Sequence, residues 1–419
     1  MEIKAIERCR SCLSKNLIPI ISLGEQYIAD FVDTPKNSPK IPLELVLCDI
    51  ESGGCGLLQL KHTTPPELLY KQYWYMSGVN QTMREALADV THKAERLVRL
   101  STGNIVLDIG CNDGTLLRSY TTKNIKLVGF EPAGNLVPLA EKDTTKIIND
   151  FFSYEEFKKN FGDEKAKIIT SIAMFYDLDD PNKFVSDISN CLDKDGLWII
   201  QMNYLCSMLE QNAFDNICHE HLEHYSLLSL NNLLNKHGFE IFDLELNNLN
   251  GGSFRVYIKH QGSKSIKPLE GAGERLRKIE EYESNFGLHN KEVYEKFAQR
   301  ISDTASKIHN FIKTETAKGK KVYVYGASTR GNTLLQFCNL DNKLIKAAAE
   351  RNPVKWGKKT NGTLIPIISE EQARSEKPDY MLVLPWHFLK EFIEREKAYL
   401  ELGGKFIVPL PYFRVINKE

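Results

Sequence analysis

The stretch Asn216 to Ser226, NICHEHLEHYS, concentrates side chains that could bind a metal or move a proton. Neither zinc-protease signature fits it, because HExxH needs a histidine where Glu223 stands and HxxEH needs a glutamate where Leu222 stands. His221 and His224 are three residues apart and could share one face of a helix. Two histidines are few ligands for a metal ion.

The second chemistry open to this stretch is proton transfer. An imidazole with a carboxylate beside it is the usual equipment for removing a proton near neutral pH, and His221 with Glu220 or Glu223 supplies both. The plain alternative is a solvated helix start with capping side chains, which the stretch taken by itself favours. The neighbouring elements must show whether the stretch is a proton-transfer site or a capped helix start.

Four cysteines near the start of the chain form another candidate site. Cys9 and Cys12 make a CxxC pair, whereas Cys48 and Cys55 are separated by six residues in LCDIESGGC. Thiolates so placed can hold a structural zinc ion, and this region has few apolar residues for a core of its own. Spacing leaves open that Cys48 is a buried strand residue and CxxC a chance pair. A redox CxxC is disfavoured because no strand and helix precede it in thioredoxin order.

The segment NIVLDIGCNDGTLLRSY predicts a strand over 105–109, a glycine turn and an apolar-periodic helix, the first βα unit of a doubly wound fold. Glu131 ends the next apolar strand, where an acidic side chain can bind ribose hydroxyls. The turn is not GxGxxG, and Asp108 and Asp113 disfavour a phosphate by their charge. Together with the close glycine backbone at Gly110, these features favour S-adenosylmethionine (SAM). A nucleotide-fold domain with no ligand there is the alternative.

Further strands complete this domain. A third strand ends at Asp150, which could meet an adenine amine, with Phe151 or Phe152 beside the ring or simply in the core. KIITSIAMFYDLDDP and GLWIIQMNY read as buried strands, and FEIFDLELN and GGSFRVYIKH follow as two more. Their order matches the methyltransferase variant of the fold, in which the last strand inserts antiparallel. NICHEHLEHYS then lies over the carboxyl edge of the sheet, where ligands bind.

The chain as a whole, 419 residues, exceeds what one hydrophobic core usually organises, so two or three domains are expected. A net charge of -1 provides no field that favours nucleic acid or an anionic membrane. No long apolar run or signal segment stands out, and nine cysteines, an odd number, fit a reducing compartment. We expect a cytoplasmic protein with a small-molecule partner, no nucleic acid and no membrane. A monomer is compatible with the sequence, which does not set the oligomeric state.

Residues 262–319 are charged with a helical period and are expected to bridge two domains. KVYVYGASTRGNTLLQF then repeats the strand, glycine turn and helix of the SAM unit. Gly326 to Thr333 spells GxxxxGNT, but Asn332 stands where a Walker A motif needs lysine, which disfavours an NTPase. The turn and helix start could still hold the diphosphate of a substrate, with Arg330 paired to it. A purely structural turn is the alternative.

These segments together carry a family resemblance. With CRSC, CGLLQL, YWYMSG, VLDIGCNDGTLL, HEHLEHYSL, NGGSFRVY, VYGASTRGNTLL, RNPVKWGKK and PYF in this order, the chain resembles the nucleotide-deoxysugar C-methyltransferase family. The resemblance implies an α/β protein with a zinc-binding N-terminal module (1–72) and a class I, Rossmann-like methyltransferase domain that binds SAM (73–262). It further implies a helical connector (263–318) and a C-terminal nucleotide-fold domain that contributes to substrate binding (319–419). The implied acceptor is C-3 of a 4-keto sugar linked to a nucleotide.

The resemblance and the patterns above assign the site residues. His221 is expected to be the general base, Glu220 to orient it, and Tyr176 or Tyr225 to supply a phenolic hydroxyl near the ketone. The expected ligands of a structural Zn²⁺ are Cys9, Cys12, Cys48 and Cys55. The expected SAM-binding residues are Tyr75, Ser77, Asp108, Gly110, Asn112, Asp113, Glu131, Asp150 and Phe151. The expected substrate-binding residues are His219, Asn203, Ser328, Arg330, Gly331, Asn332 and Arg351.

The implied chemistry starts from an enolate, because a sugar carbon is not nucleophilic until the proton beside a ketone is removed. Two departures from the family pattern bear on it. Cys218 stands where the family commonly has a tyrosine, and MFYDLDDP lacks a histidine often found in that loop. The oxyanion partner, the sugar and the methylated position therefore stay open. The alternatives are an O- or N-methyltransferase for another sugar or small metabolite, and a zinc-bearing scaffold whose SAM pocket is vestigial.

Overall fold

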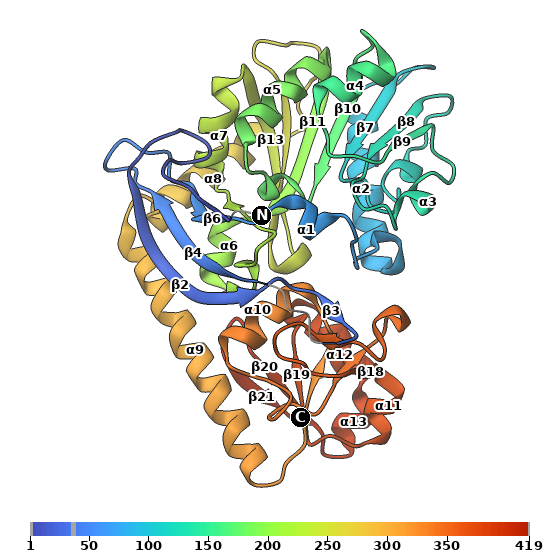
Figure 1. Ribbon diagram of the computed structural model, residues 1–419. Coiled ribbons are helices and arrows are strands. Elements are labelled where there is room, and N and C mark those ends of the chain that lie inside the picture. Colours follow the sequence, from blue (N-terminus) through green and yellow to red (C-terminus); the bar gives the residue numbers. More distant parts are fainter. Residues whose placement is uncertain (1–2, 35–38, 418–419) are drawn as a thin grey trace.

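The computed structural model describes residues 3–34 and 39–417. In Figure 1 a sheet with its covering helices lies above a second, smaller α/β domain, and the long helix α9 (Lys291–Ala317) runs down one side of both. The N-terminal strands lie against α9 and reach from the upper domain to the lower one. No helix within the described residues is long and apolar enough to cross a membrane.

The upper domain is built on a seven-stranded sheet in the order β13-β14-β11-β10-β7-β8-β9. Strands β11 to β9 are parallel, and β14 lies antiparallel between β13 and β11, which confirms the predicted strand order. Every residue of the central strand β7 is buried, as expected for a sheet covered on both faces. The strands are β7 (Ile105–Ile109), β8 (Lys126–Phe130), β9 (Lys146–Ile148), β10 (Ala166–Ile172), β11 (Leu192–Asn203), β13 (Phe239–Asn247) and β14 (Ser253–His260).

The helix predicted directly after the glycine turn is wrong, because residues 117–119 form only one 3-10 turn. The Arg118 guanidinium donates to the carbonyl oxygen of Asp113 at 2.6 Å, and the Glu95 carboxylate accepts from the backbone N–H of Thr121 at 3.1 Å. The backbone becomes extended at Tyr120, with φ -66° and ψ 137°, so the helix does not continue. The helices of this domain are α2 (Gln81–Leu97), α3 (Val137–Ala140), α4 (Tyr154–Phe161), α5 (Pro181–Cys191), α6 (Leu205–Glu210) and α7 (Leu227–Lys236).

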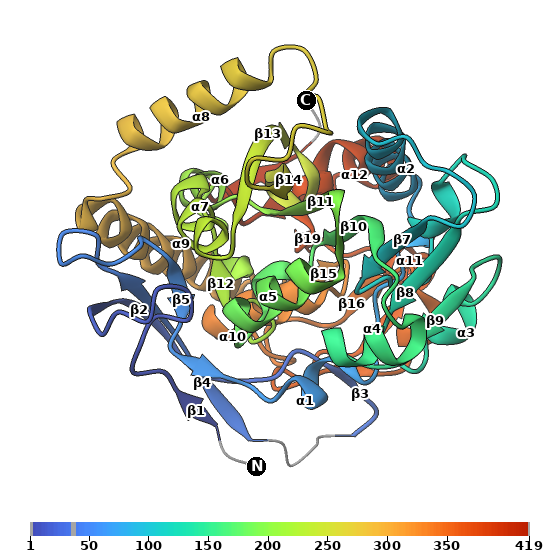
Figure 2. The ribbon, with the colours of Figure 1, turned by 90° about the horizontal axis from the view of Figure 1, so that it is seen from above.

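The N-terminal module shares its sheets with both domains. Its main sheet has the order β12-β5-β4-β2, and β12 (Glu223–His224) comes from the upper domain. A second pairing joins β3 (Phe31–Val32) to β17 (Lys359–Thr360) of the lower domain. The module's own elements are β1 (Lys4–Ala5), β2 (Leu17–Tyr27), β4 (Lys40–Cys48), β5 (Leu58–Leu60), β6 (His62–Thr63) and α1 (Pro66–Tyr70). Figure 2 shows these strands along one side of the molecule.

The predicted helical bridge consists of two helices with different roles. Helix α8 (Ala272–Phe286) packs on β13, and its buried Glu283 accepts from the backbone N–H groups of Leu227 and Leu228 at 2.6 and 3.0 Å. That carboxylate caps the start of α7 and favours it through the helix dipole. Helix α9 then carries the chain to the lower domain (Figure 1).

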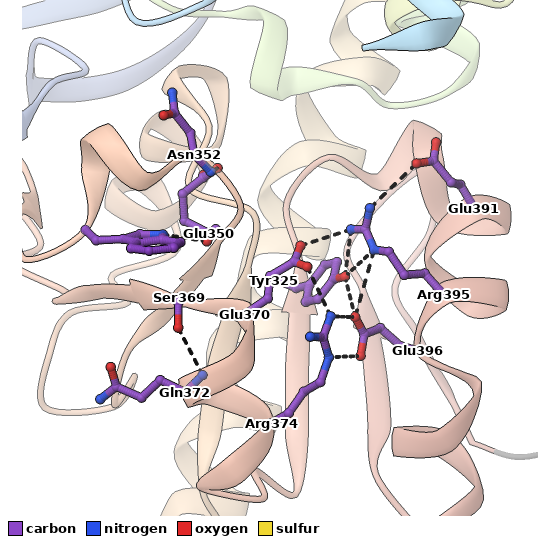
Figure 3. Close-up of polar contacts among 11 residues, drawn as sticks. Tyr325, Glu350, Asn352, Ser369, Glu370, Gln372, Arg374, Glu391, Arg395 and Glu396 are labelled. Carbon is purple, nitrogen blue, oxygen red and sulfur yellow. Dashed lines mark hydrogen bonds and ion pairs between the residues drawn. The ribbon is translucent and has the colours of Figure 1, made fainter. Parts of the chain in front are cut away.

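The lower domain repeats the doubly wound pattern with the strand order β18-β16-β15-β19-β20-β21, of which only β21 is antiparallel to its neighbour. A polar network links β15 to α11 and to the residue after α12: the buried Glu396 carboxylate accepts from the partly exposed Arg374 at 2.8 Å and from the Tyr325 hydroxyl at 2.7 Å (Figure 3). The elements are β15 (Val322–Tyr325), α10 (Thr329–Phe337), β16 (Ala348–Glu350), β18 (Ile367–Ser369), α11 (Glu370–Ser375), β19 (Tyr380–Val383), α12 (Leu389–Arg395), α13 (Lys397–Glu401), β20 (Lys405–Val408) and β21 (Arg414–Ile416).

Candidate active site

Four cysteine sulfurs converge in the N-terminal module. The Sγ atoms of Cys9, Cys12, Cys48 and Cys55 lie within 4.8 Å of one another, with Cys9–Cys55 at 3.6 Å and Cys12–Cys48 at 3.4 Å. A tetrahedral zinc ion with Zn–S bonds of about 2.3 Å has its sulfurs about 3.8 Å apart. The four cysteines therefore fit zinc. The six-residue gap is accommodated because the chain turns back through Gly53, whose φ is 82°.

The thiols of this cluster also perturb one another's ionisation. Hydrogen bonds from Cys48 and Cys55 lower the pKa of Cys9 to about 2. Hydrogen bonds with Cys48 and Cys9 raise the pKa of the Cys55 thiol. One thiolate thus forms readily and discourages the next, so a full set of thiolates requires a cation among them.

The same module holds the NICHEHLEHYS segment in place. Strand β12 pairs antiparallel with β5, and the backbone N–H of Leu60 donates to the carbonyl oxygen of Leu222 at 2.8 Å. The Nε2 of His219 lies 3.1 Å from the carbonyl oxygen of Ile41 in β4 and donates to it, since a carbonyl can only accept. Burial lowers the pKa of His219 to about 4, so the side chain is neutral. Its hydrogen bond anchors the loop of the upper domain to the N-terminal module.

The segment itself is neither helical nor solvated, so the reading as a solvated helix start is wrong. Residues 214–216 form a 3-10 turn, β12 follows, and α7 begins only at Leu227, where Ser226 makes a capping box. Glu223 and His224 are buried, and they do not share a helix face with His221. Within the described residues the four cysteines form the one cluster of His, Cys, Asp and Glu whose ligand atoms converge.

His221 is held by the backbone and by an aromatic ring. Its Nδ1 lies 3.0 Å from the carbonyl oxygen of Asn216 and therefore carries the hydrogen, which leaves the lone pair on Nε2. The Tyr176 ring meets the imidazole edge to face with centroids 4.5 Å apart. Burial, and then the positive charge of Arg330, lower the pKa of His221 well below its ordinary value. The imidazole is neutral at pH 7 and able to accept a proton at Nε2.

The predicted partner of His221, the Glu220 carboxylate, is not its hydrogen-bond partner. No hydrogen bond between described residues joins the two side chains, and Glu220 Oε2 is buried with no partner. The orienting contact comes instead from the carbonyl of Asn216, a backbone atom that residue types do not reveal. Burial raises the pKa of Glu220.

The glycine turn after β7 brings the predicted SAM residues together. Gly110 has a φ of 70°, and an added Cβ would lie 3.3 Å from Met174 of the neighbouring β10 loop, so only glycine fits there. Both Glu131 oxygens accept backbone N–H groups, from Asn112 at 2.7 Å and Ala133 at 2.8 Å. A carboxylate has about four lone-pair sites, so ribose hydroxyls can still bind Glu131.

Two carboxyl groups in this turn are buried. Burial raises the pKa of Asp108 to about 7, while its Oδ1 accepts from the Thr170 hydroxyl at 2.6 Å. Burial also raises the pKa of Glu131 to about 7. A cation in the site would favour the ionised forms, and a phosphate would oppose them, so the turn fits the positively charged SAM.

The segment after α1 lies across this turn. Asn112 Oδ1 accepts from the backbone N–H of Ser77 at 2.9 Å, and Asn112 Nδ2 donates to the carbonyl oxygen of Tyr75 at 3.1 Å. Asp113 Oδ2 accepts from the N–H of Gly78 at 2.7 Å. Tyr75, Ser77, Asn112 and Asp113 are thus brought together as predicted, although the contacts seen here join the chain to itself.

The adenine end of the predicted site is open. Asp150 and Phe151 are exposed at the end of β9, and the Phe151 ring lies edge-on to Tyr70 with centroids 6.4 Å apart. Phe152 instead packs against Phe130 and Phe184 in the core. Of these two phenylalanines, Phe151 is therefore the one that is accessible to stack on an adenine ring.

The predicted substrate residues of the lower domain lie at the start of α10, with one exception. Ser328 Oγ caps α10 by accepting from the N–H of Gly331 at 3.0 Å, and Asn332 Nδ2 donates to the carbonyl oxygen of Asp30 at 3.3 Å. Arg351 follows β16 and is exposed to solvent. In the upper domain, Asn203 at the end of β11 hydrogen-bonds to the Asn216 side chain.

Arg330 forms an ion pair with a residue that the sequence patterns did not indicate. Its Nη2 forms a 2.7 Å ion pair with Asp215, whose side chain is only 3% exposed, and Trp386 Nε1 donates to the same Oδ2 at 3.3 Å. Arg330 and Asp215 also line a cavity of about 260 Å³ between the two domains. Arg330 Nε, Asp215 Oδ1 and His387 Nδ1 are buried without partners, so polar groups of this cavity are free to bind a ligand.

Comparisons with known proteins agree with this architecture. Three family descriptions match in succession: a zinc binding domain over residues 9–70, "Methyltransferase domain" over 79–244 and "C-methyltransferase C-terminal domain" over 248–411. C-methyltransferase NovU of Streptomyces niveus is 30% identical over 100% of this chain and 98% of its own length.

Solved structures match less than half of the chain at low identity. A SAM-dependent methyltransferase from Clostridium acetobutylicum is 13% identical, over 43% of this chain and 92% of its own, with a TM-score of 0.32. Magnesium protoporphyrin IX methyltransferase from Synechocystis is 12% identical, over 44% of this chain and 88% of its own, with a TM-score of 0.34.

The sheet order, the glycine turn and the four-cysteine cluster define a class I SAM-dependent methyltransferase with a zinc-binding module. Within that class, the chain belongs to the C-methyltransferases, as its full-length identity to NovU shows. Its acceptor atom is therefore carbon, and the alternatives of O- or N-methyl transfer and of a vestigial scaffold are set aside.

Proposed function

We propose that the protein methylates the carbon next to the ketone of a nucleotide-linked keto-deoxysugar, C-3 of a 4-keto sugar, through an enolate. One observation carries the proposal: His221 is neutral, is fixed through its Nδ1 hydrogen and keeps an Nε2 lone pair at the carboxyl edge of the sheet. Because the imidazole is uncharged, its Nε2 lone pair is available to accept a proton at neutral pH. Bound SAM supplies the electrophilic methyl group.

The residues around His221 then divide the work. Asn216 and Tyr176 fix the imidazole ring, and the rigid placement contributes to the rate by proximity. His219 anchors the loop to the N-terminal module, and Asn203 bonds to the side chain of Asn216. Glu220 is retained as a member of the site without direct contact to the base.

The cofactor is assigned to the turn after β7. The proposed SAM-binding residues are Tyr75, Ser77, Asp108, Gly110, Asn112, Asp113, Glu131, Asp150 and Phe151. The four cysteines Cys9, Cys12, Cys48 and Cys55 hold the structural zinc. Zinc then stabilises the module that β12 joins, and its role is to hold the base in position.

The nucleotide part of the substrate is assigned to the cavity between the domains. The start of α10 offers backbone N–H groups, and Arg330 offers the charge, to a diphosphate there. The Asp215–Arg330 pair must open or be shared for this to happen, because the pair as it stands is neutral. The proposed contacts are Ser328, Arg330, Gly331, Asn332 and Arg351.

The domain boundaries and the setting complete the proposal. We assign residues 1–72 to the zinc module, 73–262 to the methyltransferase domain, 263–318 to the connector and 319–419 to the nucleotide-fold domain. A cytoplasmic location is consistent with nine free cysteines.

The acceptor is tested with SAM carrying a ¹³C methyl group and a panel of nucleotide-linked sugars, each supplied as the ketone and as the reduced alcohol. The expected product of the ketone shows the labelled methyl bonded to the carbon beside the carbonyl, and the alcohol gives no product. Label on oxygen or nitrogen, or equal turnover of the alcohol, contradicts the proposed substrate class.

A further inference from the structure

Two carboxyl groups on the loops that carry His221 and Tyr176 have no step in the reaction assigned above: Glu220 is buried and Asp177 is half-buried. Asp177 belongs to the 3-10 turn Phe175–Asp177 that follows β10, next to Tyr176, whose ring contacts His221. Glu220 directly precedes His221 in the loop after β11. The Tyr70 hydroxyl joins them, since it donates to the backbone oxygen of Glu220 at 3.1 Å and also interacts with the Asp177 carboxyl.

Both carboxyl groups present an oxygen with no partner. Asp177 Oδ1 and Glu220 Oε2 are shielded from solvent and make no hydrogen bond, and Glu220 is only 8% exposed. A buried polar atom left unpaired costs free energy, so such atoms mark places where a ligand completes the hydrogen bonding.

Their surroundings also decide their charge. Burial, and then the neighbouring Glu220 and Glu223, raise the pKa of Asp177 well above its ordinary value. The charge of Arg330 also acts on Tyr176 and Cys218, but among the ion pairs of the described residues none joins Arg330 to Asp177. The raised pKa favours the protonated form of Asp177, and a carboxylic acid can donate a hydrogen bond where a carboxylate cannot.

We propose that Asp177, as a carboxylic acid, donates the hydrogen bond that stabilises the substrate's ketone oxygen as the enolate forms. Asp177 shares its loop with Met174, which lies next to Gly110 of the proposed SAM turn, and with Tyr176, whose ring contacts His221. This assignment rests on the proposed function. In this assignment the oxyanion partner is the Asp177 carboxylic acid and not the phenolic hydroxyl of Tyr176 or Tyr225.

His221 Nε2 takes the proton from the carbon beside the ketone, the C–H electron pair becomes the enolate π bond, and negative charge grows on the oxygen that Asp177 faces. The enolate carbon then forms its bond to the methyl carbon as the bond from that methyl to sulfur breaks. The carbonyl re-forms, Asp177 keeps its proton, and His221 releases the extra proton to solvent.

The test compares variants of Asp177 in the full-length, zinc-containing protein with a ketone substrate identified as above. Asp177→Asn keeps a donor of the same shape, whereas Asp177→Ala and Asp177→Leu are two non-donors of different size. Asp163→Asn is the matched control, because Asp163 is exposed on the turn before β10, at the opposite end of that strand. Circular dichroism and zinc content select the folded variants.

We expect the non-donor variants to lose about 10²–10³-fold in kcat with KM and SAM affinity nearly unchanged, as for removal of an oxyanion donor. Asp177→Asn should retain activity within about tenfold of the wild type, since an amide N–H also donates. Solvent deuterium exchange beside the ketone should fall in parallel with kcat.

Two outcomes overturn the assignment. Wild-type rates in a folded Asp177→Ala or Asp177→Leu protein remove Asp177 from the reaction while leaving His221 and the enolate route intact. A loss in Asp177→Asn as large as in Asp177→Ala shows that the carboxyl is needed for its charge or basicity and not as a donor. If the wild type neither exchanges nor methylates any keto sugar, the proposed function fails as well.

Discussion

At the scale of single residues, strand and turn patterns predicted where the residues of the turn after β7 lie, but not the hydrogen-bond partner of His221. Asp108, Gly110 and Glu131 sit where strand and turn patterns place them, because backbone geometry fixes those positions. The orienting group of His221 is the Asn216 carbonyl, which any residue would provide. A pattern of side chains therefore favoured Glu220 instead.

The protonation of His221 gives a prediction for the pH dependence of the reaction. Its lowered pKa means that the neutral form, the one able to accept a proton, persists below the ordinary histidine range. We expect kcat/KM to stay level as the pH falls from about 8 to 6.5 and to decline only at lower pH. A pH–rate profile that already halves near pH 7 contradicts a buried neutral base.

Glu131 gives a prediction for the cofactor. In Glu131→Gln one oxygen becomes an NH₂ group that faces a backbone N–H donor, from Asn112 or Ala133. We expect SAM affinity to fall about tenfold, roughly 1.4 kcal/mol, in calorimetry. Glu141→Gln, a change at the exposed residue directly after α3, serves as the control. Unchanged affinity in Glu131→Gln removes Glu131 from the SAM site.

At the scale of elements, the sequence predicted most strands and their order. It did not predict the strand pairings that join the N-terminal module to the two domains. β13 and β14 begin and end near the predicted runs, since alternating or continuous apolar patterns report burial directly. β12 is two residues long and pairs with β5, more than 160 residues earlier in the chain. A pairing so short and so distant leaves no periodicity in the sequence.

This pairing joins the loop that carries His221 to the zinc-binding module. Cys48→Ser should lose zinc, lower the melting temperature and also reduce kcat, because β5 would no longer hold the loop that carries His221. Metal analysis, thermal melts and turnover are measured together. Glu51→Gln, an exposed change in the same turn, should leave all three unchanged. A zinc-free variant with full turnover contradicts the supporting role.

At the scale of the whole molecule, the sequence predicted two nucleotide-type folds joined by helices, and the structure adds how they meet. The turn in each fold is capped by an acid at the end of its second strand, Glu131 above and Glu350 below, and Glu350 accepts from the N–H of Ala327 at 2.9 Å. The Asp215–Arg330 ion pair then joins the two domains. Such a contact depends on how the domains pack, which local patterns do not encode.

The interdomain cavity predicts separable ligand effects on stability. Saturating SAM and a nucleotide sugar should each raise the melting temperature, since a ligand at one hundred times its Kd adds about 2.7 kcal/mol. Arg330→Gln should abolish the shift from the nucleotide sugar and retain the shift from SAM. Arg277→Gln, an exposed arginine on α8, is the control. Equal nucleotide-sugar shifts in Arg330→Gln and wild type contradict the assignment of the diphosphate.

The central claim is that His221 removes a proton from the carbon beside a ketone, and solvent exchange tests it most directly. The protein is incubated in deuterated water with a nucleotide-linked keto sugar and the demethylated cofactor, so that no methyl transfer can follow. We predict deuterium at that one carbon with the wild type and its loss in His221→Ala, whose SAM affinity remains near that of the wild type. Exchange that persists undiminished in His221→Ala, or methylation by a wild type that never exchanges, contradicts the account.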